Sequence, residues 1–292
     1  HRLLIAPIAS WLPQDRERTV IIVPHGSLFL LSFAALRDRS GIYLAERYAL
    51  AFTPSLALLA WTGRQRLASG PEAPALVVGN PRMPEPRPGE GALSSLGDAA
   101  AEAREVAVAM GRPAEVLLGA AAGEGTVRRR AGRASMVHLA THGVVDAADP
   151  MASLVALAPQ DGPAGGDGRW TLAEIQQDRL AAELVTLSAC DTGLGPISAD
   201  GVQGLARAFL VAGARSVMVS LWRVAEIPTR YQMERFYSAL ARNGGDRARA
   251  LQEAQLATLE ELRRGRLHAP SGRPIPESPA FWAPFVLVGE PH

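Results

Sequence analysis

The chain has 292 residues, 48% of them hydrophobic, and a formal net charge of +1 at pH 7. This composition supports a sizeable core in one or two domains, and the near-zero charge argues against nucleic acid or an anionic membrane surface as a partner. The single cysteine excludes an intrachain disulfide framework and a cysteine-rich metal site, and it is typical of a reducing compartment such as the cytoplasm.

The N-terminal portion of the chain predicts short strands and one helix. Strands are expected at 19–24 and 48–53, and a helix from 54 to 65. The segment 71–91 is rich in proline and glycine, and only an apolar run at 75–79 interrupts it, which predicts a buried strand. We therefore divide the chain into an N-terminal portion, 1–70, and a main domain, 71–292. Because the chain begins with histidine and not methionine, we expect a segment of a longer protein. We find no signal-peptide pattern and no apolar run of membrane-spanning length.

From residue 98 onward, predicted helices and strands alternate, which is typical of βαβ units in a mainly parallel sheet. Helical spacing and strand-length apolar runs follow one another along this part of the chain. The expected helices are 98–110, 172–177, 201–212, 229–242 and 246–264, and the expected strands are 136–142, 153–158, 184–190, 216–221 and 285–288.

Two of these strands end on reactive side chains. One ends at His142, which Gly143 follows, and the other ends at Cys190. Chemistry gathers at the carboxyl ends of parallel strands, so a thiol and an imidazole would meet if the two strands are neighbours. Cys190 would then be the nucleophile and His142 the acid–base group, with the amides of Gly143 and Cys190 as the oxyanion hole. The histidine lies 48 positions before the cysteine, close to the roughly 50 known for caspases.

Each of the two residues also has a structural interpretation. A lone cysteine at the end of a buried strand is usually a small core residue, and a lone histidine there is usually a hydrogen-bonded polar group. The pairing of the two motifs favours the catalytic interpretation. His138 lies inside the strand and is expected to be structural and to point away from the site. The His25–Gly26 dipeptide is expected to form a turn.

The chain resembles the CHAT-domain family, the caspase-like peptidase domains commonly found behind TPR repeats. The resemblance implies a caspase/separase fold: a mostly parallel sheet of about six strands with helices on both faces. It also implies an N-terminal portion that is either an accessory segment or a degenerate caspase-like copy. It also implies His142 and Cys190 as the catalytic dyad. The matching segments are 23–26, 33–36, 44–48, 54–55, 138–143, 187–193, 201–222 and 281–289.

In such proteases the substrate lies extended along the strand after the cysteine strand, a form of β-augmentation. The resemblance places Ser220, Leu221, Trp222, Arg223 and Val224 in that segment. Trp222 would wall a substrate pocket or belong to the core.

The residue that selects the substrate side chain stays open. Relatives with an acidic residue near the position of Glu226 favour a basic P1 residue, so Glu226 is the first candidate. Arg223 resembles the arginine with which caspases hold an acidic P1, and the two side chains could instead pair with each other. Asp191 is a further acidic candidate, although it suits a turn before Gly193. Pro228 restricts the loop after Glu226 and starts the next helix.

The sequence thus predicts a cysteine endopeptidase, a regulated signalling or defence protease that works through a thioester without a metal or organic cofactor. Its expected partners are a protein or peptide substrate and a regulatory TPR region or activating protein, with no nucleic acid and no membrane. One alternative is a catalytically latent caspase-like scaffold. A thioesterase or amidase with the same dyad ranks lower, and the Gly-x-Ser-x-Gly elbow of α/β-hydrolases is absent.

Overall fold

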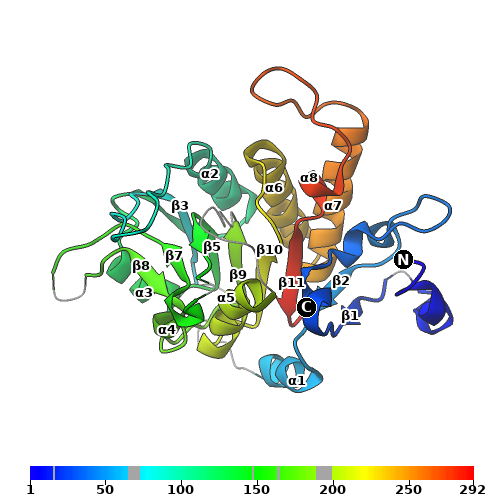
Figure 1. Ribbon diagram of the computed structural model, residues 1–292, viewed down its shortest axis with the longest axis horizontal. Coiled ribbons are helices and arrows are strands. Elements are labelled where there is room, and N and C mark those ends of the chain that lie inside the picture. Colours follow the sequence, from blue (N-terminus) through cyan, green and yellow to red (C-terminus); the bar gives the residue numbers. More distant parts are fainter. Residues whose placement is uncertain (16, 65–72, 147, 163–164, 189–198) are drawn as a thin grey trace.

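A computed structural model describes residues 1–15, 17–64, 73–146, 148–162, 165–188 and 199–292. Its centre is an eight-stranded sheet between two layers of helices (Figure 1). In spatial order the strands are β1 (Val20–Ile22), β2 (Leu50–Phe52), β11 (Phe285–Gly289), β10 (Ser216–Ser220), β9 (Leu184–Ser188), β5 (Met136–Ala140), β3 (Ala75–Pro81) and β4 (Ala114–Gly119). Among the described residues, β10 and β11 pair antiparallel and the other neighbours in this sheet pair parallel.

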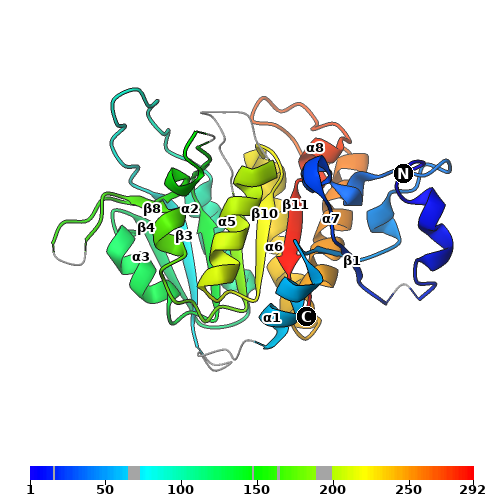
Figure 2. The ribbon, with the colours of Figure 1, turned by 60° about the horizontal axis from the view of Figure 1, so that its bottom comes forward.

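Helices cover both faces of the sheet (Figure 2). Each face has its own apolar core. Phe209 and Trp170 pack on one face at a ring distance of 5.2 Å, and Phe236 and Tyr237 pack on the other. The first layer contains α3 (Glu124–Ala131), α4 (Leu172–Ile175) and α5 (Ala199–Ala212), and the second contains α2 (Ala99–Ala109), α6 (Glu226–Arg242) and α7 (Arg247–Arg263). Two shorter helices are α1 (Leu56–Arg64) and α8 (Pro279–Trp282).

A small antiparallel sheet follows the end of β5. It consists of β6 (Gly143–Val144), β7 (Leu154–Ala156) and β8 (Arg169–Thr171). The strand expected at 153–158 therefore belongs to this second sheet. Its position matters because β6 begins directly after His142 and ties that residue to β7.

The architecture confirms the expected α/β fold and corrects its size. The main sheet has eight strands where about six were expected, because β1 and β2 extend it through the pair Phe52–Val288, and because β4 was missed. Helix α3 was also missed. Helix α6 starts at Glu226 with Pro228 in its first turn, as expected for a proline that lacks an N–H to donate. None of the helices in the described part of the chain is long and apolar enough to cross a membrane.

Candidate active site

The two strands with reactive ends are neighbours, as expected. β5 and β9 pair parallel, with Ala140 opposite Ser188 at their carboxyl ends. His142 follows Ala140 by two positions, and Cys190 follows Ser188 by two positions in the sequence. Cys190 and Asp191 lie outside the described residues, so the structure describes the histidine half of the predicted dyad and the strand that leads to the cysteine.

The His142 ring is completely buried and held by a backbone acceptor. Its Nε2 lies 2.7 Å from the Ser94 carbonyl oxygen, so Nε2 carries the proton and donates it to that oxygen. This hydrogen bond fixes both the tautomer and the orientation of the imidazole. It leaves Nδ1 as the ring nitrogen that can exchange a proton with a nucleophile.

The backbone around His142 is fixed against β7. The His142 carbonyl accepts a 2.8 Å hydrogen bond from the Ala156 N–H, and the Thr141 hydroxyl donates to the Ala156 carbonyl at 2.7 Å. Gly143 therefore occupies a non-hydrogen-bonded position opposite Val155, and its N–H faces away from β7. An amide in this position can donate to an oxyanion that forms next to the histidine.

The loop that supplies the Ser94 carbonyl is anchored by Asn80. The Asn80 side-chain oxygen accepts hydrogen bonds from the Leu96 N–H at 3.0 Å and from the Ser95 hydroxyl at 3.1 Å. Asn80 itself has a positive φ of 43°, a conformation that asparagine tolerates better than most residues. A single side chain thus fixes the loop between β3 and α2 at the point where it reaches His142.

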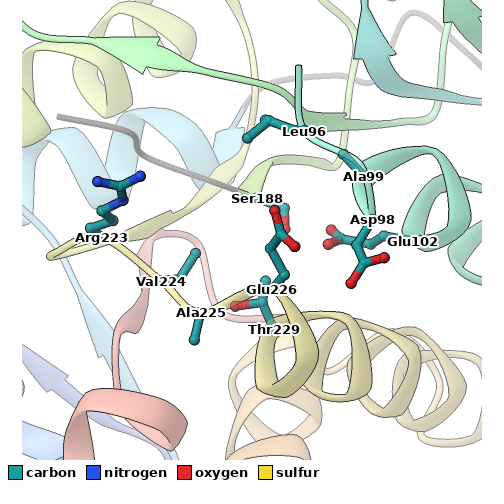
Figure 3. Close-up of a pocket in the computed structure, with 10 residues that line it drawn as sticks. All are labelled: Leu96, Asp98, Ala99, Glu102, Ser188, Arg223, Val224, Ala225, Glu226 and Thr229. Carbon is teal, nitrogen blue, oxygen red and sulfur yellow. The ribbon is translucent and has the colours of Figure 1, made fainter. Parts of the chain in front are cut away.

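A pocket of about 280 Å³ lies beside the end of β9 (Figure 3). Its walls come from the loop before α2, from α2 itself and from the connection between β10 and α6. The lining residues are Leu96, Asp98, Ala99, Glu102, Ser188, Arg223, Val224, Ala225, Glu226 and Thr229. The Ser188 hydroxyl is fully buried and has no hydrogen-bond partner among the described residues. Such a hydroxyl can be satisfied by a water or a ligand that enters the pocket.

Three of the four charged side chains that line this pocket are carboxylates. Figure 3 shows the acidic groups of Asp98, Glu102 and Glu226 grouped on one side, whereas the Arg223 guanidinium lies apart from them. Asp98 is the N-cap of α2 and Glu226 is the first residue of α6, where helix dipoles favour negative charge. Glu102 differs because it is buried, 6% exposed, one helical turn after Asp98. The pocket therefore suits a cationic side chain.

The remaining predicted substrate residues have different surroundings. Ser220 and Leu221 are buried, and the Leu221 N–H donates to the Pro284 carbonyl at 2.9 Å. Trp222 packs partly buried against the core, and its indole N–H donates to the Ala280 carbonyl at 3.1 Å. These three residues are not among the pocket's lining residues, whereas Arg223 and Glu226 are.

Sequence reasoning missed several pocket residues, above all Asp98 and Glu102 of α2. It also took His138 as purely structural. His138 is indeed fully buried, but its Nε2 lies 3.0 Å from Glu102 Oε1, so it contacts a side chain that lines the pocket. Within the described residues, no group of three or more histidine, cysteine, aspartate or glutamate side chains could hold a metal ion.

This architecture was compared with known protein families. The CHAT domain family matches residues 1–290 of this chain. The chain belongs to the CHAT-domain family. Tetratricopeptide repeat protein 28 from Homo sapiens is 29% identical over 335 aligned residues, and the protein of the same name from Mus musculus is 28% identical. The match covers 99% of this chain but 13% of each relative, so the CHAT domain spans a small part of these proteins.

Solved structures confirm the caspase-like fold of this CHAT domain. The Saccharomyces cerevisiae separase in its complex with securin matches with a TM-score of 0.57 and 13% identity, over 94% of this chain and 15% of the separase chain. The Arg-specific cysteine proteinase gingipain R matches with a TM-score of 0.50 and 12% identity, over 84% of this chain and 54% of its own. At these identities the similarity concerns the fold.

Proposed function

We propose that this CHAT domain is a cysteine endopeptidase with Cys190 as nucleophile and His142 as acid–base group. The observation that carries the proposal is the parallel pairing of β5 and β9, which brings Ala140 beside Ser188, each two positions before a dyad residue. The fold it shares with separase and gingipain R supports the same conclusion.

The chemistry follows from the orientation of His142. Nε2 stays bonded to the Ser94 carbonyl, so Nδ1 takes the thiol proton as the sulfur attacks the peptide carbonyl carbon. The carbonyl oxygen becomes an oxyanion, for which the Gly143 and Cys190 amides are the proposed donors. As the C–N bond breaks, Nδ1 returns the proton to the leaving amine, and a thioester remains. Water, deprotonated by the same nitrogen, then releases the acid and restores the thiol.

The substrate residue before the scissile bond is proposed to be basic. The pocket beside the end of β9 carries Asp98, Glu102 and Glu226, which fits arginine or lysine. Gingipain R, described as Arg-specific, has the same fold. Glu226 is therefore the preferred selecting residue over Arg223, whose guanidinium lies apart from the carboxylates in Figure 3. Asp191 stays a further candidate in the sequence.

Regulation by another protein segment is proposed from the relatives. Two of them are named as tetratricopeptide repeat proteins, and the separase structure is a complex with securin. A repeat region or a separate regulatory protein would control access to the site in the cytoplasm. The proposal includes no metal and no organic cofactor.

The test is digestion of a diverse peptide library by the wild-type domain and by Cys190→Ala, with cut sites read by mass spectrometry. We expect cuts after arginine or lysine that only the wild type makes. Equal cleavage by Cys190→Ala would refute the dyad, and cuts after acidic residues would assign selection to Arg223. If no peptide is cut, labelling of Cys190 by a peptide electrophile identifies a latent enzyme, and absence of labelling favours a scaffold. Hydrolysis of small esters or amides alone would indicate a thioesterase or amidase.

A further inference from the structure

Glu102 lines the pocket, and its carboxylate is contacted from the interior of the sheet, on the side away from the pocket. Its side chain is 8% exposed, and one of its oxygens, Oε1, lies 3.0 Å from Nε2 of His138. His138 belongs to the middle of β5 and is fully buried. The contact therefore runs from the interior of the sheet to the wall of the pocket. In Figure 3 the Glu102 carboxylate lies next to that of Asp98.

The other side of the His138 ring is also bonded. Nδ1 lies 3.1 Å from the Tyr237 hydroxyl oxygen, which in turn lies 2.8 Å from the Thr186 hydroxyl oxygen. Burial raises the pKa of Tyr237, so this phenol keeps its proton. The two rings also pack edge to face, 5.5 Å apart. Thr186 of β9 and Tyr237 of α6 thus fix the imidazole that contacts Glu102 of α2.

These contacts offset two costs of the pocket's carboxylates, their mutual repulsion and the lost hydration of the buried one. Asp98 and Glu102 lie one turn apart on α2, and Glu226 lies on the same side of the pocket, so three like charges face one cavity. A buried carboxylate also loses its hydration and needs a hydrogen-bond donor. The His138 Nε2–H supplies that donor on the side away from the pocket, which leaves the second oxygen of Glu102 for a ligand.

We propose that His138 is a positioning residue for substrate recognition, which holds Glu102 by Oε1 so that its other carboxylate oxygen meets the basic P1 side chain. The inference rests on the proposed function in taking the pocket as the P1 site. It does not require the cysteine to be reactive, because it concerns binding. Its consequence is selective: loss of His138 weakens recognition of a basic side chain and leaves contacts with the rest of the peptide in place.

The test measures binding in the Cys190→Ala background, so that no peptide is consumed. Fluorescence anisotropy compares two labelled peptides that differ only in P1, arginine in one and norleucine in the other. The variants are His138→Leu, which removes the donor, and His138→Gln, whose amide can still donate to Glu102. Gln255→Leu is the matched control, since it removes a buried hydrogen bond to the Phe285 carbonyl that involves neither His138 nor Glu102. Circular dichroism and thermal unfolding of each variant establish that it folds.

We expect His138→Leu to weaken binding of the arginine peptide about tenfold or more, the effect of losing a hydrogen bond to a charged group, with norleucine binding unchanged. His138→Gln should recover most of the arginine affinity, and Gln255→Leu should lose stability but keep the preference for arginine. Equal losses for both peptides in His138→Leu would overturn the inference, as would an unchanged preference. If His138→Leu fails to fold, the His138→Gln variant decides the question. A His138→Gln variant that shows no preference for arginine would overturn the inference. No preference for arginine in Cys190→Ala itself would instead refute the basic P1 pocket, and binding without wild-type cleavage would refute only the catalysis.

Discussion

Arg230 of α6 binds Glu105 of α2 through two hydrogen bonds, 2.6 Å and 2.5 Å long. These helices carry the pocket's carboxylates, and Glu105 lies one turn beyond the buried side of Glu102. The hydrogen bond with Glu105, together with the charges of Asp98 and Glu102, raises the pKa of Arg230. The ion pair thus holds the two acidic walls of the pocket together and supplies the nearby positive charge that offsets part of their repulsion.

Glu105→Gln should loosen this contact and weaken substrate binding. Because both side chains are partly exposed, solvent screens the pair, and we expect KM for a basic-P1 peptide to rise about two- to fivefold with little change in kcat. Arg242→Gln is the control, since its ion pair with Glu253 joins α6 to α7 away from the pocket. Steady-state kinetics at low and high salt provide the readout. A similar effect from both variants would contradict a specific role for the Arg230–Glu105 pair.

Asn80 should control the rate of the chemical step through the Ser94 loop. Asn80→Gly fits the positive φ of this position but removes the oxygen that accepts from Leu96 and Ser95. We expect kcat to fall about 10- to 100-fold, because a displaced Ser94 carbonyl misorients His142. Asn80→Asp keeps an acceptor oxygen and should retain most of the rate. Single-turnover kinetics on one peptide compare the two variants, and equal rates would show that loop anchoring does not govern the histidine.

Much of the fold was predictable because its central strands are uninterrupted apolar runs and its long helices have helical apolar spacing. The runs at β5, β9 and β10 are fully buried, which matches their sequences. The missed elements lack these signals. β4 lies at the sheet edge and is mostly half-buried, and α3 is a short helix with three consecutive arginines. Such segments owe their structure to neighbours that the sequence does not identify.

The site was predictable where a residue follows a strand and was not where packing brings distant residues together. His142 and Gly143 stand out because a buried strand ends just before them. Glu102 lies 36 positions before His138, on a helix whose orientation depends on how it packs against β3. No local pattern distinguishes Glu102 from a solvated glutamate. The same limit applies to the Ser94 carbonyl, since a backbone acceptor has no signature in the sequence.

Gly79 should be required for the position of α2. A Cβ atom at this residue would lie 2.5 Å from both the Ala103 Cβ and the Ala99 carbonyl oxygen, so the helix would have to move. We expect Gly79→Ala to lower the free energy of unfolding by about 1–3 kcal/mol, as overpacking does. Gly97→Ala is the control, because a Cβ there meets nothing within 4 Å. Urea unfolding of both variants tests this, and equal stability would argue that α2 shifts freely.

Two glutamates should give the stability opposite dependences on pH. Burial is the main cause that raises the pKa of Glu124 above its ordinary 4.5, whereas the hydrogen bond from Arg169 is the main cause that lowers the pKa of Glu90. The folded state therefore binds the Glu124 proton more tightly than the unfolded state, and this contribution to stability is lost as pH rises from 4.5 through the raised pKa. The Glu90 contribution is present above 4.5 and is lost as pH falls through the lowered pKa.

Glutamine variants separate these two contributions. Relative to the wild type, Glu124→Gln should gain stability as pH rises from about 4 to about 7, because the penalty for ionising a buried carboxylate disappears. Glu90→Gln should lose stability over the same range, because the ionised partner of Arg169 is missing. Urea unfolding at each pH gives the difference in free energy for each variant. Differences that change with pH in the same direction for both variants would contradict the assignment of burial to one glutamate and ion pairing to the other.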